Sequence, residues 1–273
     1  MIMSHANQQF YQSLNDYFDA IYVITIQRAV DRRAKLMPLL EGLNYQFFYG
    51  MDKQLLEADA ALLAQLYSEE KAKGFHRYNK PMIIGHVACS LSHRMVYEDM
   101  IQRNIQRALI FEDDVIPQFD TLPLIPAILA ELPANWDTVY FGYDKNGVSS
   151  NSTTIKQYFY HALHALGMLK WNHTMVKHLF AKPFSKHLRK AGYHDLLHAY
   201  GMSLNAAKVM VELQTPIAFN ADPAVAWAVS NGMLNAYITE PQIFMQEVQL
   251  HPDTYISMVK ENSNHTDLNN PNE

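Results

Sequence analysis

Short apolar runs alternate with longer amphipathic segments along most of this chain. An apolar run bounded by turn residues predicts a buried strand, whereas apolar residues three or four positions apart predict a helix. Strands are expected at 20–26, 45–49, 107–112, 138–141, 197–200, 236–239 and 243–246. Because strands that alternate with helices form a mainly parallel sheet, the pattern predicts an α/β fold with a central sheet flanked by helices.

The segments between these runs predict helices, several of which carry capping residues at their ends. Helices are expected at 8–18, 31–40, 55–73, 86–103, 121–132, 155–171, 173–180 and 204–213. A further helix is expected after Pro223, ending at Asn231. Asp31 and Ser203 are expected N-caps, Asp222 before Pro223 has the form of another, and Gly74 should lie just past the end of its helix. A polar linker is expected at 149–154 and a disordered Asn-rich tail at 261–273, which leaves one domain over 1–260.

Charge is distributed unevenly along the chain. The segment 145–194 holds seven Lys, one Arg and no Asp or Glu, so it carries +8, and the net charge of −5 then leaves −13 for the remainder. This basic segment also carries aromatic residues such as Trp171, which favour a membrane interface. It suits an anionic lipid surface or a phosphorylated glycan, and a solvated basic face is the simpler alternative. Nucleic acid is not expected as a partner, because the rest of the chain is acidic.

The sequence also indicates a compartment. A single cysteine, Cys89, excludes a disulfide framework and suits a reducing environment. Residues 1–20 show no basic start followed by an apolar core, so no signal peptide is expected. No apolar run reaches the length of about 20 residues that spans a bilayer. The expected location is therefore the cytoplasm, and the protein could also contact a membrane peripherally there.

Three acids follow one of the apolar runs directly. The run 108–111 leads into Glu112, Asp113 and Asp114. Carboxylates at the tip of a buried strand repel one another and lose solvation, and a hard cation with oxygen ligands compensates such a cluster. Strand alternation should put Glu112 and Asp114 on one side and Asp113 on the other. The arrangement suits an acid-x-acid motif that holds a divalent metal on a diphosphate, and the alternative is three surface acids that open a loop.

A second candidate site lies after the first expected strand, where Arg28, Asp31 and Arg32 follow one another closely. A strand, loop and helix start with arginines suits a nucleotide, because guanidinium groups and helix N-termini both favour phosphate. The alternative is that the arginines are solvated and Asp31 only caps the helix. His93 lies among small residues of the helix expected at 86–103, and a satisfied buried histidine is a simpler interpretation than a ligand or base.

Several segments, taken in this order, resemble glycosyltransferase family 25, which includes bacterial lipopolysaccharide galactosyl- and glucosyltransferases and has collagen galactosyltransferases as eukaryotic relatives. They are the opening strand with Arg28, Asp31 and Arg32; Cys89-Ser90-Leu91-Ser92-His93; Leu109-Ile110-Phe111-Glu112-Asp113-Asp114-Val115; Ala199-Tyr200 to Ser203 with Ala207-Lys208; and Asp222 followed by Tyr237, Pro241 and Gln246. The resemblance spans about residues 20–246. Thr25-Ile26, His86 and Ala88 depart from the family's usual Asn-Leu, Glu and Gly, and residues 150–195 match little.

The resemblance implies a GT-A-like fold that transfers a hexose, galactose or glucose, from a UDP-sugar to a lipopolysaccharide-type glycan with inversion. It implies Mn²⁺ or Mg²⁺, held by Glu112 and Asp114, and a catalytic base at Asp222 whose alternative is an ordinary N-cap. Donor-binding residues would be Arg28, Asp31, Arg32, Ser92, His93 and Asp113. Residues 150–195 would form a basic helical insertion or acceptor region, with peripheral contact to the inner membrane.

Two other classes of function remain open on the sequence. A metal-dependent phosphohydrolase would use similar acids but transfer phosphate to water. A non-catalytic sugar-nucleotide-binding protein would bind UDP with metal and turn over no acceptor. Response-regulator receiver domains also carry Glu-Asp-Asp at a strand end, but they do so on their first strand, whereas here at least two strands precede Glu112.

Overall fold

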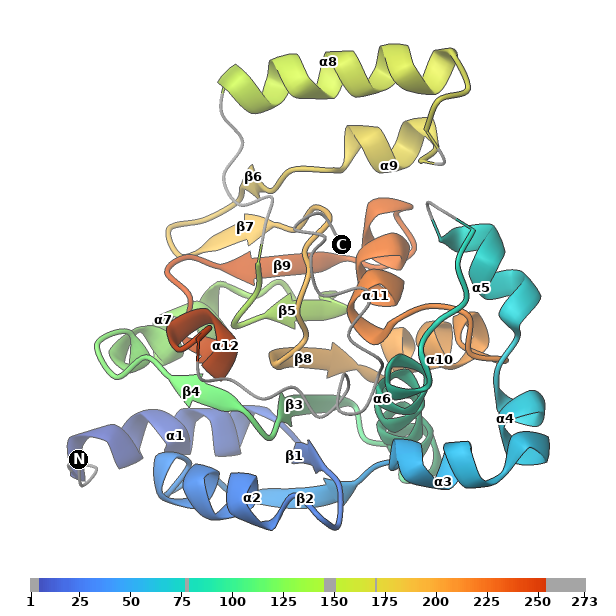
Figure 1. Cartoon of the computed structure of the whole chain (residues 1–273). Helices are drawn as coiled ribbons and strands as arrows, with labels where there is room; N and C mark the ends of the chain where they lie inside the picture. The colour runs from blue at the N-terminus through green and yellow to red at the C-terminus, as the bar shows by residue number, and fades with distance from the viewer. Residues whose placement is uncertain (1–4, 77–78, 145–150, 170, 254–273) are drawn as a thin grey trace.

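The structure, a computed structural model, describes residues 5–76, 79–144, 151–169 and 171–253 (Figure 1). Its central sheet has eight strands in the order β2-β1-β3-β8-β5-β9-β7-β6. In chain order they are β1 Ala20–Thr25, β2 Tyr45–Tyr49, β3 Arg107–Glu112, β5 Thr138–Tyr140, β6 Lys182–Pro183, β7 Leu188–Lys190, β8 Ala199–Ser203 and β9 Ala236–Thr239. The remaining two strands, β4 Val115–Pro117 and β10 Phe244–Gln246, pair with each other as a separate antiparallel ribbon.

The sheet is mixed, but most of its strands run in one direction. β2, β1 and β3 are parallel neighbours, and so are β5 and β9. β8 runs antiparallel to both β3 and β5, and β7 runs antiparallel to both β9 and β6. All strands of the sheet except β8 and β7 therefore share a direction. This arrangement confirms the predicted α/β class and is consistent with a GT-A-like fold.

Helices cover both faces because the central strands are apolar on both sides. Along β3, Ala108 and Ile110 belong to one core, whereas Leu109 and Phe111 belong to the other. The first core is closed by α6, α10 and α11, and the second by α1, α2 and α7 (Figure 1). The bounds are α1 His5–Tyr17, α2 Val30–Leu36, α6 Ile84–Gln102, α7 Ile125–Glu131, α10 Leu204–Leu213 and α11 Ala221–Ser230, with short elements η1 Met37–Leu39, η2 Leu122–Leu124 and α12 Glu247–Leu250.

The single helix expected at 55–73 is wrong, because three short helices occupy this part of the chain. They are α3 Lys53–Ala58, α4 Ala60–Leu66 and α5 Glu69–Phe75. Asp59 accepts a hydrogen bond from the backbone N–H of Leu62, and Ser68 accepts one from that of Lys71. These side chains cap new helices in the middle of a segment whose apolar spacing suggested one. Gly74 lies inside α5 and not beyond its end.

Other expected boundaries also shift. α2 begins at Val30 with Ala29 at its N-cap, so Asp31 is not the cap but an exposed acid in the first helical turn. The expected linker 149–154 is wrong from Asn151 onward, where α8 (Asn151–Ala165) begins. Residues 149 and 150 and the tail 261–273 lie outside the described part of the chain. The strands β4, β6 and β7 were not predicted.

The described residues of the basic segment, 151–169 and 171–194, fold as two helices and a hairpin at one edge of the sheet. α8 and α9 (His173–Lys177) lie beyond the hairpin of β6 and β7, at the top of the view in Figure 1. β7 joins this hairpin to the sheet by pairing with β9. Across the residues that the structure describes, no helix combines the length and apolar character needed to cross a bilayer.

Candidate active site

The centre of the site is the acidic turn, the name used here for Glu112, Asp113 and Asp114. β3 lies between β1 and β8, and it delivers Glu112 at its carboxyl end. A tight turn over the next two residues leads into β4, whose Val115 pairs with Gln246 of β10. The three acids are therefore held between the buried end of β3 and a short antiparallel ribbon.

Glu112 and Asp114 converge on one amide group. Gln246 Nε2 lies 3.2 Å from Glu112 Oε2 and 3.3 and 3.2 Å from the two carboxylate oxygens of Asp114. Asp114 is 6% exposed, so its charge is largely removed from water. Neighbouring carboxylates that share a single neutral donor keep most of their mutual repulsion.

Asp113 faces a different set of partners. Its carboxylate accepts a hydrogen bond of 2.7 Å from Thr25 Oγ1 at the end of β1 and one of 2.9 Å from Arg32 of α2. The same Arg32 nitrogen lies 3.6 Å from Asp114 Oδ2. The side-chain alternation expected from the sequence is confirmed, and Arg32 joins the two sides of the turn.

His93 links the acidic turn to the interior. This α6 residue is 2% exposed, and its Nε2 lies 3.1 Å from Glu112 Oε1 while its Nδ1 lies 2.8 Å from the hydroxyl of Tyr200. Tyr200 in turn lies 2.8 Å from the hydroxyl of Tyr97. Desolvation alone raises the pKa of Glu112, but the hydrogen bond from His93 and nearby cationic groups outweigh it and hold this pKa below its usual range.

Ser92 and Cys89 lie on the same helix but have different surroundings. Ser92 Oγ donates to the carbonyl of Ala88 at 2.8 Å and accepts from the backbone N–H of Met51 at 2.9 Å. A Cβ at Gly50 would lie 2.3 Å from Ser92 Oγ, so the loop after β2 needs glycine there. Ser92 thus anchors a loop. Cys89, His93 and Glu112 each offer a metal-ligand atom, and these atoms lie within 4.8 Å of one another.

The other residues expected to bind the sugar-nucleotide donor, Arg28 and Asp31, lie farther from the acidic turn, in α2 and the loop before it. Arg28 forms an ion pair of 2.7 Å with Asp52, the residue that caps α3. Asp31 is exposed in the first turn of α2. The structure therefore brings Arg32 and His93 to the acidic turn, of which Asp113 is itself a member, whereas Arg28 and Ser92 fasten neighbouring loops and Asp31 faces solvent.

Asp222 is half-buried near the start of α11. The N-cap of α11 is Asn220, so the interpretation of Asp222 as an ordinary N-cap is wrong. Its Oδ2 accepts a hydrogen bond of 3.2 Å from the backbone N–H of Leu196. Burial, followed by the neighbouring charge of Asp195 and with a contribution from Glu112, raises the pKa of Asp222 to about 6. A carboxyl group with this pKa ionises near neutrality and can accept a proton there.

The acidic turn fits a divalent cation. Glu112 and Asp114 present oxygen ligands, which Mg²⁺ and Mn²⁺ prefer. The turn carries three carboxylates, and Arg32 is the permanently charged cation bonded to it among the residues that the structure describes. A buried cluster with surplus negative charge is stabilised by a metal ion.

Gln246 was not predicted as a site residue. Its place in an expected strand was known, but the register that brings it to Val115 is set by the ribbon of β4 and β10. Thr25 and Tyr200 were missed for a similar reason, because their direct contacts with Asp113 and His93 depend on β1 and β8 being the neighbours of β3 in the sheet. The signal that could have found Gln246 is a lone amide in an otherwise apolar strand.

Known proteins share this sequence pattern. The family model described as glycosyltransferase family 25 (LPS biosynthesis protein) matches residues 18–225. A glycosyltransferase 25 family member of Aedes aegypti is 26% identical over 251 residues, covering 87% of this chain and 37% of its own. Procollagen galactosyltransferase 2 of Mus musculus is 23% identical over 132 residues (46% of this chain, 21% of its own), and inactive glycosyltransferase 25 family member 3 of Homo sapiens is 25% identical over 132 residues (46% and 22%).

The chain spans little more than a third, or less, of the length of these curated relatives. The family match, however, covers most of the described sheet and includes the acidic turn, Arg32, His93 and Asp222. An α/β fold with an acid cluster at the end of a central strand agrees with that match. On both grounds, the chain belongs to glycosyltransferase family 25.

Proposed function

We propose that this chain transfers a hexose, galactose or glucose, from a UDP-sugar to a lipopolysaccharide-type glycan, with inversion and with a divalent metal. The observation that supports the proposal best is the convergence of Glu112 and Asp114 on Gln246 at the end of β3. Glu112 and Asp114 would hold Mn²⁺ or Mg²⁺. A divalent cation bound there would neutralise the diphosphate that leaves with the nucleotide.

The chain's own residues would have the following roles. Arg32 would position the acids and the donor phosphates, because it already bridges Asp113 and Asp114. Arg28, Asp31, Ser92, His93 and Asp113 would shape the donor site, Arg28 and Ser92 through the loops they fasten.

Asp222 would act as the base. It would accept the proton of the acceptor hydroxyl while that oxygen bonds to the anomeric carbon and the bond from that carbon to UDP breaks. A pKa of about 6 supports this role, since Asp222 is ionised at neutral pH yet basic enough to accept a proton.

The experiment that tests this function combines binding and turnover. A thermal-shift screen of UDP-glucose and UDP-galactose, each with and without Mn²⁺, should show metal-dependent stabilisation. A donor at a hundred times its dissociation constant stabilises by about 2.7 kcal/mol. The donor that stabilises should then be consumed only when an acceptor glycan is added. Release of phosphate to water without acceptor would instead indicate the phosphohydrolase.

A non-catalytic sugar-nucleotide-binding protein is the second candidate. It is favoured by the similarity to a human relative whose name describes it as inactive. Both candidates predict stabilisation by UDP-sugar and metal, and they differ in turnover. Transfer that is lost in Asp222→Asn while donor binding persists supports the enzyme, whereas binding without any turnover supports the second candidate.

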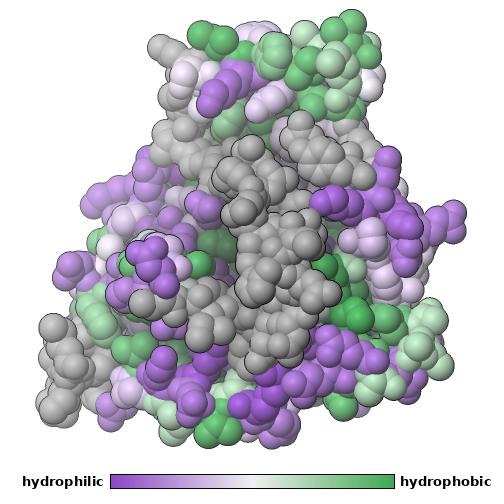
Figure 2. All heavy atoms as spheres, in the orientation of Figure 1, coloured by the Kyte–Doolittle hydropathy of each residue, from purple (hydrophilic) through white to green (hydrophobic). Residues whose placement is uncertain are grey.

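We also propose that the basic segment is an acceptor region that touches the cytoplasmic face of the inner membrane. α8 exposes an apolar stripe at helical spacing, with Ile155 71%, Tyr158 72% and Phe159 60% exposed, and Leu166, directly after the end of the helix, is 72% exposed. Figure 2 shows hydrophobic residues gathered over this helix at the top of the molecule. Apolar side chains beside lysines are the features of a helix that lies on an anionic membrane surface.

A further inference from the structure

A cavity of about 480 Å³ lies at the edge of the sheet opposite the acidic turn. Its Asp137 and Asn235 directly precede β5 and β9. Met202 of β8 pairs with both Ala108 at the start of β3 and Thr138 at the start of β5, so the cavity lies level with the beginning of β3. The acidic turn lies at the other end of that strand. This cavity is therefore separate from the proposed catalytic centre.

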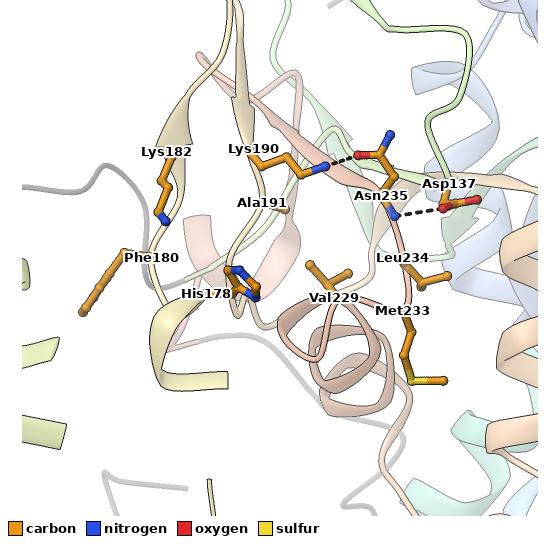
Figure 3. Close-up of a pocket in the computed structure, with 11 residues that line it drawn as sticks. Asp137, His178, Phe180, Lys182, Lys190, Ala191, Val229, Met233, Leu234 and Asn235 are labelled. Atoms are coloured by element: carbon orange, nitrogen blue, oxygen red, sulfur yellow. Dashed lines mark hydrogen bonds between the residues drawn. The ribbon is translucent and has the colours of Figure 1, made fainter. Parts of the chain in front are cut away.

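One wall of the cavity carries two lysines beside a histidine. Lys182 of β6, Lys190 of β7 and His178 after α9 all line it, and all three come from the basic segment (Figure 3). Within the described ranges, no carboxylate forms an ion pair with Lys182 or Lys190. By contrast Arg189, between them in sequence, is paired with Glu240. Among the described residues, the charge of these lysines is therefore compensated in part by the Asp137 carboxylate in the same cavity, which favours charged Lys190, and not by an ion pair.

Lys190 is held in place before any ligand arrives. Its ammonium group donates to Asn235 Oδ1 (Figure 3). The same group lies 4.6 Å from the centre of the Tyr237 ring. Burial lowers the pKa of Lys190, which means that its charged form lacks solvation. The nearby Asp137 carboxylate already accepts from the backbone N–H of Asn235 at 2.8 Å and from Asn205 at 3.0 Å. Asp137 offsets only part of the effect of burial on Lys190, and an incoming anion would add to that compensation.

The facing wall is apolar. Val229 of α11 and Met233 and Leu234 of the turn before β9 line it (Figure 3). Gly232 has φ of 76°, in the left-handed region, and this sharp turn places Met233 and Leu234 after the end of α11. Apolar side chains opposite cations suit a ligand with a charged group at one end and C–H faces on its body, as in a sugar.

We propose that this cavity is a second binding site, and that it takes a sugar bearing a phosphomonoester. A phosphomonoester carries close to two negative charges and three acceptor oxygens, which match two lysines better than a single carboxylate does. The volume is near the lower end of small-ligand sites and suits one or two sugar units. The sugar phosphate belongs to the acceptor glycan if the proposed transferase function holds, and the site itself does not depend on that function.

The first test measures binding without turnover. Titration calorimetry on the whole chain at low salt, with UDP and Mn²⁺ present in excess to occupy any donor site, should detect glucose 6-phosphate and, more weakly, inorganic phosphate, but not glucose. Lys182→Gln with Lys190→Gln should weaken glucose 6-phosphate binding at least tenfold. Lys186→Gln, a change at an exposed lysine in the same hairpin, should leave it unchanged.

Two further variants keep this test decisive. Lys182 is exposed, so Lys182→Gln alone should weaken binding severalfold even if the change at Lys190 lowers thermal stability. Asp114→Asn should retain glucose 6-phosphate binding, because the acidic turn lies at the other end of β3. The proposal of a second site would be overturned if wild type and the double variant bound glucose 6-phosphate equally well. It would also be overturned if Asp114→Asn lost glucose 6-phosphate binding.

The second test distinguishes the two sources of the sugar phosphate. A phosphorylated lipopolysaccharide core oligosaccharide and the same material after phosphatase treatment are compared with free glucose 6-phosphate. Phosphate-dependent binding of the oligosaccharide, weakened in the double variant, identifies the acceptor as the source. Binding of free sugar phosphate alone identifies a small-molecule effector of the same site. If neither binds wild type, the proposal is wrong, whereas failure of turnover alone contradicts only the transferase function.

Discussion

At the scale of single residues, Asp114 has the sharpest expected effect. It is the buried member of the acidic turn, and its two oxygens share Gln246 with Glu112. Asp114→Asn removes charge and almost no volume, so transfer should fall by about 10²-fold or more while the fold persists. Thermal unfolding should show an unchanged or higher melting temperature without metal and a smaller gain on adding Mn²⁺. Near-normal transfer by this variant at limiting Mn²⁺ would show that Asp114 does not hold the metal.

The raised pKa of Asp222 predicts that activity increases with pH while the contribution of this residue to stability decreases. Its pKa, raised to about 6, means that the folded chain binds this proton more tightly than the unfolded chain does. Its stabilising contribution is therefore complete below about pH 4 and is lost as the pH rises through about 6. The ionised form, needed for proton abstraction, becomes dominant over that same interval.

Asp222→Asn separates these two effects. Asparagine can still accept the hydrogen bond from Leu196 but cannot act as a base, so kcat should fall by about 10²- to 10⁴-fold. The acid limb of the wild-type rate profile near pH 6 should disappear with it. Stability at pH 7.5 should rise by about 1 kcal/mol, a figure discounted for the partial exposure of this side chain. A variant that keeps full activity, or that keeps the acid limb, excludes Asp222 as the base.

Arg32 should affect the donor more than the acceptor. It lies 2.9 Å from Asp113 and 3.6 Å from Asp114, so Arg32→Ala removes the cation that joins the acids. The KM for UDP-sugar should rise about tenfold or more, and the acceptor KM should change little. Lys35→Ala, at an exposed position in the last turn of the same helix, is the matched control. A larger change in the acceptor KM would assign this loop to the acceptor.

At the scale of elements, α8 is expected to hold the chain on anionic lipid. Ile155→Ser with Phe159→Ser should lower co-sedimentation with anionic vesicles by about tenfold, because burial of these apolar side chains in the interface is lost. Lys156→Gln with Lys177→Gln should weaken binding at low salt, each lysine contributing about 1 kcal/mol. Neutral vesicles should bind less, and high salt should reduce the difference.

Leu55→Ser is the control for the apolar change, since Leu55 is 59% exposed on α3 and lies outside the basic segment. It should sediment like wild type. The charge variant changes Lys156 and Lys177 but not Lys190, because the ammonium group of Lys190 donates a hydrogen bond to Asn235. The docking of α8 would be contradicted if wild type did not co-sediment with anionic vesicles at low salt. It would also be contradicted if the variant changed at Ile155 and Phe159 co-sedimented as well as wild type.

The elements that the sequence predicted well are those buried on both faces. β1 and β3 each have an apolar, buried central run because each lies between two layers of helices, and the pattern locates them to within a residue. β6 and β7 were missed because they lie at the edge, where Leu188 is the buried member of a strand otherwise made of Arg189 and Lys190. The breaks within 53–75 depend on the capping bonds of Asp59 and Ser68, which apolar spacing does not report.

At the scale of the whole molecule, the candidate site was predictable where one strand supplies it. The order of Glu112, Asp113 and Asp114 along the chain was enough to expect their division between two sides, and the contacts confirm it. The partners come from elsewhere. Thr25 and Tyr200 meet the site because β1 and β8 are the neighbours of β3, and strand order is a property of the assembled sheet. A single sequence carries no direct record of that order.

The pairing of β4 with β10 has a consequence for synthesis on the ribosome. The bond from Gln246 to Glu112 joins residues 134 positions apart, so the acids leave the ribosome long before the amide that they share. During that interval Arg32 and Thr25, made earlier, and His93 on α6 can already contact the turn, but the ribbon cannot close. The chemistry of the turn is therefore completed by one of the last described strands to be made, and a nascent chain released before Gln246 would carry the acids without that partner.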